Sequence, residues 1–259
     1  MIVNEINLSN LIPKCTKLGS FNVLNGNVKI GKNVVLGSNC VISGNIEIGD
    51  NCIIGNSVEI TGDVKIGKSC TLSSGVKFGG AAQHLKVSEL TDKKIIIGSH
   101  NTFRENSTIH MPYHKQVTIV GNNNYIMVNV NIPHDAKVGN NNVICNNVSL
   151  GGSVELGNYC NLGLNAVLHQ NIKVGSYAMI GMGTIIDKNI LPFSMVSGSK
   201  KVSLSINIVG FNRNYTGDIR MKDILSMLKA PFESTPFLTQ LKETKDFLEY
   251  DNSKGFYLL

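Results

Sequence analysis

The chain has 259 residues, enough for one or two domains, and 42% of them are hydrophobic. Trp is absent and aromatic residues make up only 6%, so the apolar content is chiefly aliphatic and favours a thin, regularly stacked core. The net charge is +6 and its Lys and Arg residues are scattered. This excludes a basic nucleic-acid-binding surface and fits anionic small molecules or an acidic carrier.

The first twenty residues contain no apolar segment of the signal-peptide kind, and no apolar run approaches the ~18 residues of a membrane span. We therefore expect a cytoplasmic protein without a membrane span. Four cysteines recur at one position of the repeat described next and are expected to pack in the core rather than bind metal, because no CxxC motif occurs: Cys40, Cys52, Cys70 and Cys160.

An aliphatic or aromatic residue recurs every six positions, from Ile12 to Phe78 and again from Val120 to Ile186. A helix has a period of 3.6 and a strand a period of 2, so a period of six indicates a β-helix in which three hexads close one coil. Gly often follows the apolar residue, as in Leu36-Gly37, and Gly or Asn is what a corner with positive φ requires.

Two interruptions, residues 80–95 and 111–118, break the repeat and are expected to form loops on its outer face. Pro192 ends the repeat. The expected organisation is a β-helix over 1–191, a linking segment over 192–216 and an α-helical region over 217–259. Asp218 is the expected cap of a first helix through Lys229, and a second is expected from Ser234 or Thr235 to Leu248.

One ionisable pair, His134-Asp135, interrupts the aliphatic wall. Eighteen residues make one coil, so His134, Gly152 and Gln170 are expected in one column about 5 Å apart, with Asp135 and Ser153 in the next column. Acyl transfer needs a base and a donor for the developing oxyanion. His134 could be the base, with Asp135 or another carboxylate fixing its tautomer, and the Gly152 N–H could donate to the oxyanion. The alternative is that His134 is an exposed histidine without a catalytic role.

Several stretches share a pattern with one enzyme family; they are Ile132-Pro133-His134-Asp135, Gln83-His84-Leu85-Lys86, Leu168-His169-Gln170 and the segment from Asn207 to Arg213. They resemble the UDP-N-acetylglucosamine O-acyltransferases of lipid A synthesis and relatives that N-acylate nucleotide-linked amino sugars. The resemblance implies an all-β solenoid, a left-handed parallel β-helix with a small C-terminal α-helical domain, that forms a homotrimer. It also implies His134 as general base, Asp135 as its orienting group and Gly152 as oxyanion donor. By the same resemblance, the substrate is bound by Gln83, His84, Lys86, Asn131, Ser153, His169, Gln170, Asn207 and Arg213.

The sequence departs from the family pattern at several polar positions. Asn131 and Ser153 stand where the family has histidines, His84 where it has an aspartate, and Val209 where it has an acidic residue. A site that keeps its base but changes its polar lining is expected to take a different sugar. We therefore expect transfer of an acyl group, including a 3-hydroxyacyl group, to the amine of a nucleotide-linked sugar such as dTDP-4-amino-4,6-dideoxyglucose. The alternative is the 3-hydroxyl of UDP-N-acetylglucosamine.

The acyl donor is expected to be acyl-CoA or acyl carrier protein, with no bound cofactor or metal. Two other function classes stay open from the sequence. A zinc enzyme of the γ-carbonic anhydrase kind would need three histidines across a trimer interface, and only His110 and His114 lie at ligand-like spacing. A non-catalytic scaffold would need no histidine at all.

Overall fold

The computed structural model describes residues 17–86, 89–198, 203–217, 220–229 and residue 255. The chain divides into an N-terminal unit, residues 1–135, and a C-terminal unit, residues 136–259. In each unit short parallel strands stack on strands from the next coil. Away from the two interruptions of the repeat, the partners are 18 residues apart, as in Leu36 with Ile54 in the first unit and Leu150 with Leu168 in the second. The predicted parallel β-helix of hexads is therefore confirmed.

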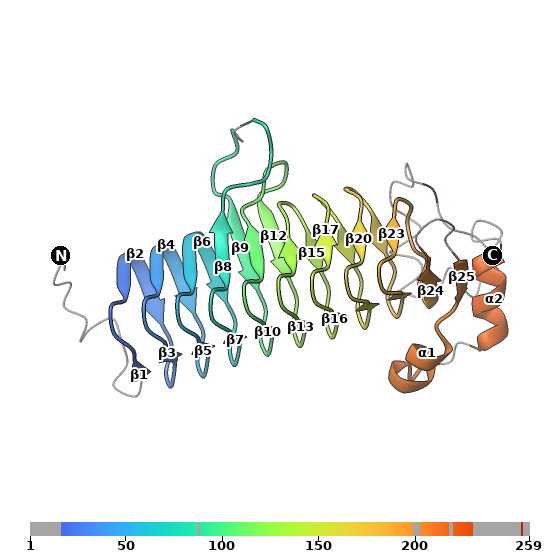
Figure 1. Cartoon of the computed structure of the whole chain (residues 1–259), viewed down its shortest axis with the longest axis horizontal. Helices are drawn as coiled ribbons and strands as arrows, with labels where there is room; N and C mark the ends of the chain where they lie inside the picture. The colour runs from blue at the N-terminus through green and yellow to red at the C-terminus, as the bar shows by residue number, and fades with distance from the viewer. Residues whose placement is uncertain (1–16, 87–88, 199–202, 218–219, 230–254, 256–259) are drawn as a thin grey trace. The chain divides into compact units, whose positions relative to one another are not determined.

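The N-terminal unit carries one ladder of two-residue strands, in the order β1 (Lys17–Leu18), β3 (Val35–Leu36), β5 (Ile53–Ile54), β7 (Thr71–Leu72), β10 (Thr102–Phe103) and β13 (Tyr125–Ile126). Beside it lie three eight-residue strands in register, β2 (Val23–Ile30), β4 (Val41–Ile48) and β6 (Glu59–Ile66) (Figure 1). The first half of β6 pairs with β8 (Lys77–Gly80), which continues into β11 (Thr108–His110) and β14 (Asn131–Ile132). Its second half pairs with β9 (Lys94–Ile97), followed by β12 (Val117–Val120). These pairings make three faces.

The long strands cover two faces because each bends at a glycine. Gly26, Gly44 and Gly62 are paired in register and have φ of +88°, +121° and +88°. Only glycine adopts such backbone angles at little cost, and the three backbones approach closely there. The bend turns the chain from one face to the next without a loop.

Gly44→Ala is expected to destabilise the N-terminal unit by about 2–4 kcal/mol, because the new Cβ would overlap the carbonyl oxygen of Gly62 at a φ that alanine avoids. Gly183→Ala is the matched control, since its φ is +62° and nothing lies within 4 Å of the added carbon. The measurement is the urea midpoint of unfolding. Equal shifts for the two variants would contradict this account of the bend.

The glycines that follow the hexad residues have a different role from the one expected. Positive φ falls two residues later, at positions such as Asn33, Asn39 and Asn51. Gly37 itself keeps an ordinary φ, but a Cβ there would lie 2.6 Å from the backbone of Gly55 in the next coil. Of the two residue types expected at corners, these glycines do not adopt positive φ: asparagine or serine two residues later makes the corner, and glycine permits close stacking of the coils.

The C-terminal unit has three ladders of parallel strands. They are β15 (Lys137–Val138), β18 (Glu155–Leu156) and β21 (Lys173–Val174); β17 (Ser149–Leu150), β20 (Val167–Leu168) and β23 (Ile185–Ile186); and β16 (Val143–Ile144), β19 (Asn161–Leu162) and β22 (Met179–Ile180). The last ladder continues into β24 (Ser194–Ser197), which pairs antiparallel with β25 (Ser203–Ile206).

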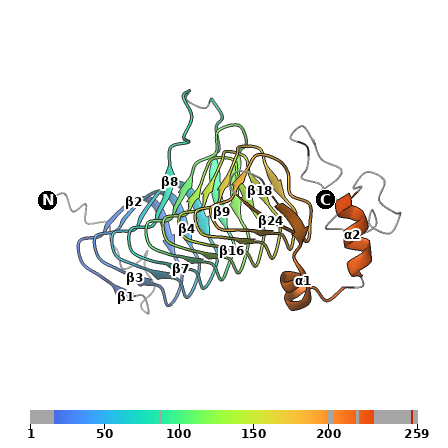
Figure 2. The ribbon, with the colours of Figure 1, turned by 45° about the vertical axis from the view of Figure 1, so that its right-hand side comes forward.

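Two helices follow these strands, α1 (Ile208–Asn214) and α2 (Met221–Lys229) (Figure 2). Residues 192–216, expected as a linking segment, thus hold β24, β25 and α1. The helix expected from Asp218 begins at Met221, and the second expected helix, from Ser234 or Thr235, lies outside the described residues. Ile224 and Leu228 of α2 are buried with Tyr177, Leu191 and Phe193 in one apolar cluster.

The hexad residues form the core of both units: every member from Ile30 to Phe78 and from Val120 to Ile186 is buried. Two hexad residues of the first described coil are exceptions, since Leu18 is 47% exposed and Leu24 is half-buried. Cys40, Cys52, Cys70 and Cys160 are buried, as expected for core packing. None of the described helices is long and apolar enough to cross a membrane.

Candidate active site

The His134-Asp135 pair follows β14 in the N-terminal unit, immediately after the buried Ile132 and Pro133. Asp135 has a φ of +62°, a left-handed conformation that Asp tolerates better than most residues. The His134 Nδ1 lies 2.8 Å from the Asp135 Oδ2. The Asp135 side chain is fully buried, whereas the His134 side chain keeps 11% exposure. The imidazole is therefore held at its Nδ1 by a buried carboxylate, and a small part of the ring stays accessible.

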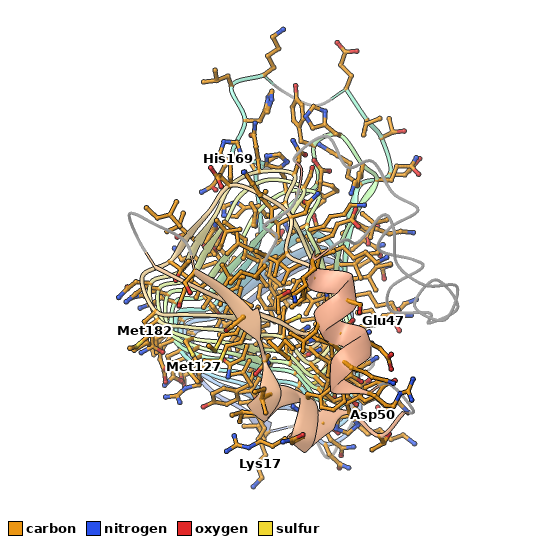
Figure 3. The ribbon with its side chains drawn as sticks, turned by 90° about the vertical axis from the view of Figure 1, so that its right-hand side faces the viewer. Lys17, Glu47, Asp50, Met127, His169 and Met182 are labelled. Carbon is orange, nitrogen blue, oxygen red and sulfur yellow. The ribbon has the colours of Figure 1, made fainter. Side chains whose placement is uncertain are left out.

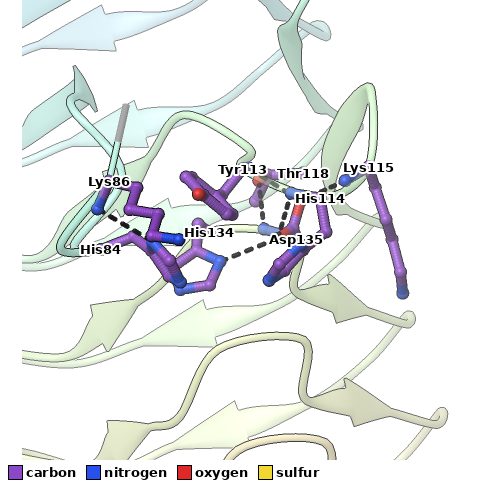
Figure 4. Close-up of polar contacts among 8 residues, drawn as sticks. All are labelled: His84, Lys86, Tyr113, His114, Lys115, Thr118, His134 and Asp135. Atoms are coloured by element: carbon purple, nitrogen blue, oxygen red, sulfur yellow. Dashed lines mark hydrogen bonds and ion pairs between the residues drawn. The ribbon is translucent and has the colours of Figure 1, made fainter. Parts of the chain in front are cut away.

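The Asp135 carboxylate is held by the loop between β11 and β12 (Figure 4). It accepts hydrogen bonds from the backbone N–H groups of Tyr113, His114 and Lys115 at 2.9, 2.9 and 2.8 Å. The Asp135 N–H in turn donates to the Thr118 Oγ1 at 3.0 Å. The second interruption of the repeat thus wraps the carboxylate and fixes its position.

These contacts set the charge and tautomer of the pair. Burial raises the pKa of Asp135, but the hydrogen bonds from His114, His134, Lys115 and Tyr113 outweigh it and hold this pKa below its usual range. An ionised carboxylate only accepts, so the His134 Nδ1 must donate to it. The His134 Nε2 then carries a lone pair, the state that a general base requires.

The lowered pKa of Asp135 makes the stability of the fold depend on pH. A carboxyl group whose pKa lies below its unfolded value, about 3.9, stabilises the fold fully above that value and loses this contribution as the pH falls through the folded pKa. We expect the free energy of unfolding to fall more steeply below about pH 4 in the wild type than in Asp135→Asn. Urea unfolding at a series of pH values measures both slopes, and equal slopes would contradict the assignment.

Three aromatic rings from the two loops surround the His134 imidazole (Figure 4). His84, from the loop between β8 and β9, stacks on Tyr113 with ring centroids 3.7 Å apart and planes 22° apart. The His134 centroid lies 6.1 Å from that of His84, 6.0 Å from that of Tyr113 and 6.3 Å from that of His114. We call these four residues the ring cluster. It joins both interruptions of the repeat to the candidate base.

The other predicted residues of the N-terminal unit lie in the first loop or beside it. Gln83 and Lys86 are exposed, and the Lys86 backbone N–H donates to the His84 Nδ1 at 3.2 Å. The Asn131 Oδ1 accepts a hydrogen bond from the Thr108 Oγ1 at 2.9 Å. The expectation that the loops serve a site is supported by the contacts around His134; the individual ligand roles stay predictions.

The remaining predicted residues belong to the C-terminal unit. Gly152 and Ser153 follow β17, and His169 and Gln170 follow its partner β20, so Gly152 and Gln170 lie 18 residues apart, as predicted, while the residue 18 after Ser153 is Asn171. The Gly152 carbonyl accepts the Asn171 N–H at 2.9 Å. His169 is exposed at the surface (Figure 3). The roles of Gly152 as oxyanion donor and of the others as ligands stay predictions.

Asn207 is the N-cap residue of α1, and Arg213 lies within this helix. The Asn207 side chain is buried, accepts the Gly210 N–H at 2.9 Å and donates to the Tyr177 carbonyl oxygen at 2.9 Å. The carboxamide oxygen therefore caps the helix and the carboxamide nitrogen ties it to Tyr177. This is a structural role in addition to the predicted role in substrate binding. Arg213, in the last turn, is exposed.

Sequence reasoning missed Tyr113 and Thr118, and considered His114 only as a metal ligand. Their signal is weak, because they fall in or beside the second interruption, outside the hexad pattern. The one available clue is that an aspartate inside an aliphatic repeat needs donors from elsewhere. Within the described residues, no group of three or more His, Cys, Asp or Glu side chains is arranged to hold a metal ion.

The fold and the repeat define a class of transferase. The model for bacterial transferase hexapeptides (six repeats) matches residues 11–44 and 45–80, and that for the hexapeptide repeat of succinyl-transferase matches residues 154–188. The acyl-[acyl-carrier-protein]–UDP-N-acetylglucosamine O-acyltransferase of Rickettsia prowazekii is 48% identical over 180 residues, which cover 62% of this chain and 67% of that protein. The chain belongs to the family of hexapeptide-repeat acyltransferases that contains this enzyme, as its motifs predicted.

Two solved structures extend the similarity to nearly the whole chain. The UDP-N-acetylglucosamine acyltransferase of Francisella novicida is 25% identical with a TM-score of 0.66, covering 96% of this chain and 92% of that one. LpxA from Acinetobacter baumannii is 26% identical with a TM-score of 0.65, covering 95% and 92%. Both similarities reach past the repeat into the C-terminal part.

Proposed function

We infer that this protein transfers an acyl group from acyl carrier protein to the 3-hydroxyl of UDP-N-acetylglucosamine, with His134 as general base. The observation that carries the proposal is the His134–Asp135 pair, in which an ionised carboxylate leaves the imidazole Nε2 free to accept a proton. The relatives named above act on UDP-N-acetylglucosamine, which supports this acceptor over the amino-sugar nucleotide that the altered polar lining had favoured.

The reaction needs two proton transfers, one from the attacking hydroxyl to His134 and one from His134 to the leaving thiolate. The His134 Nε2 takes the proton of the attacking hydroxyl as its oxygen bonds to the thioester carbon, and the imidazolium that forms stays paired with Asp135. When the tetrahedral intermediate collapses, the carbon–sulfur bond breaks and His134 returns the proton to the leaving thiolate. The products are a sugar ester and a free thiol, and the base is regenerated.

The replacement of two family histidines by Asn131 and Ser153 keeps a second acceptor in competition. A neutral amine is a better nucleophile than a hydroxyl and requires less assistance, so a nucleotide-linked amino sugar is the specific alternative. A homotrimer, in which a neighbouring subunit contributes to each site, belongs to the proposal because the family resemblance implies it.

Thiol release tests the proposal. Purified protein is mixed with acyl carrier protein or CoA carrying acyl chains of graded length, and with UDP-N-acetylglucosamine or dTDP-4-amino-4,6-dideoxyglucose. We expect turnover with the acyl carrier protein and UDP-N-acetylglucosamine, and a rise in melting temperature with that nucleotide alone. Faster turnover of the amino sugar would replace the proposed acceptor, and no turnover with any pair would reject the function.

A further inference from the structure

His84 is a second imidazole at the site, and its local contacts leave it in the opposite tautomer to His134. The Lys86 backbone N–H donates to the His84 Nδ1 at 3.2 Å, so this nitrogen is the acceptor. In a neutral imidazole the other nitrogen then carries the proton. His134 therefore offers an acceptor at Nε2, whereas His84 offers an N–H donor at Nε2.

The orientation of the His84 ring is fixed as well as its tautomer. One face stacks on Tyr113 at 3.7 Å, and the Nδ1 edge is occupied by Lys86. The residue is exposed, and the Nε2 has no hydrogen-bond partner among the described residues. The N–H is thus the one polar group of this ring that remains for a ligand.

The spacing of the two imidazoles suits the two oxygens of one acyl-transfer intermediate. Their centroids lie 6.1 Å apart with planes at 89°. A base lies about 2.6–3.2 Å from the attacking oxygen, and an oxyanion donor about 2.7–3.1 Å from the oxygen that gains charge. These oxygens are bonded to the same carbon, so both fit between rings at this separation.

We propose that His84 donates its Nε2–H to the carbonyl oxygen of the acyl thioester, so that the site has an imidazole donor facing its imidazole base. The proposal rests on the proposed acyl transfer, because only that reaction places a developing oxyanion beside the attacking oxygen. No proton leaves His84: it stabilises charge by a hydrogen bond while His134 moves the proton. His84 is thereby a catalytic residue rather than only a contact to the sugar.

Two substitutions test the roles of the two ring nitrogens of His84 separately. The side-chain oxygen of His84→Asn can replace the Nδ1 acceptor for Lys86 but cannot donate at the Nε2 position. The amide nitrogen of His84→Gln reaches that position and can donate. Removal of an oxyanion donor lowers kcat on the order of 10²–10³-fold. The loss is smaller where a second donor binds the same oxygen. We expect kcat to fall about 10- to 100-fold in His84→Asn and less than about 5-fold in His84→Gln, with the KM for the sugar nucleotide little changed.

The control is His100→Asn, an exposed histidine with a φ of +59°, which asparagine also adopts. Melting temperatures of all variants verify folding. Equal kcat values for His84→Asn and His84→Gln, or a loss confined to the KM of the sugar nucleotide, would overturn the assignment. The ratio of kcat in His84→Gln to kcat in His84→Asn is measured with whichever sugar nucleotide the wild type acylates. Failure of UDP-N-acetylglucosamine as acceptor would therefore count against the proposed function alone.

Discussion

His134→Gln is expected to lower kcat by about 10²–10⁴-fold, the usual loss when a general base is removed. The neutral amide of glutamine can fill the space beside Asp135 but cannot accept and return a proton. Although the side chain is only 11% exposed, it sits outside the hexad core, so we expect the melting temperature to change by a few degrees at most. Single-turnover acyl transfer with saturating acyl carrier protein and sugar nucleotide measures the chemical step.

The pH dependence of the same assay identifies the role of His134. A general base acts only while it can accept a proton, so the part of the pH dependence of kcat that His134 causes is expected to be absent in His134→Gln. His100→Asn serves as the matched histidine control. A variant at His134 that keeps its rate within about threefold of the wild type would show that another group accepts the proton.

Asp135→Asn is expected to reduce both activity and stability. The carboxylate accepts from three backbone N–H groups and from His134, whereas an amide would place its own N–H groups against one of those backbone donors. A buried donor left without an acceptor costs about 1–3 kcal/mol, so we expect a loss of about 2–4 kcal/mol in the free energy of unfolding.

The loss of activity in Asp135→Asn has a separate cause. An amide N–H would donate to the His134 Nδ1 and move the imidazole proton to Nε2, so the base would no longer accept. We expect kcat to fall about 10²–10⁴-fold. Thr118→Val is the structural control, because it removes the acceptor of the Asp135 N–H at a cost of about 1–2 kcal/mol but leaves the tautomer unchanged. Equal losses of kcat in the two variants would mean that Asp135 acts only through the fold.

The repeat could be predicted from the sequence because one physical requirement recurs in every coil. Each hexad places an aliphatic side chain such as Ile132 in the same narrow core, so aliphatic residues recur every six positions in the sequence. Corners were harder to predict, because Gly37 and Asn39 both suit turns. Only the distance between coils reveals that glycine serves the stacking and asparagine the positive φ.

The candidate base and its carboxylate were visible in the sequence because they are polar residues inside an apolar pattern. Their surroundings were not, because Tyr113 and His114 lie in a loop without periodicity. The hydrogen bonds to Asp135 come from backbone groups, which any sequence possesses. The pairing of His84 with Tyr113 joins two separate loops, a relation that no local pattern encodes.

The proposed roles of the two imidazoles require opposite tautomers, which nuclear magnetic resonance can measure directly. Long-range ¹H–¹⁵N correlation spectra of histidine-labelled protein, assigned with His134→Gln and His84→Gln, report which ring nitrogen carries the proton. We predict a protonated Nδ1 and bare Nε2 for His134, and a bare Nδ1 and protonated Nε2 for His84, at neutral pH. A protonated Nε2 on neutral His134 would contradict its assignment as the base that Asp135 orients.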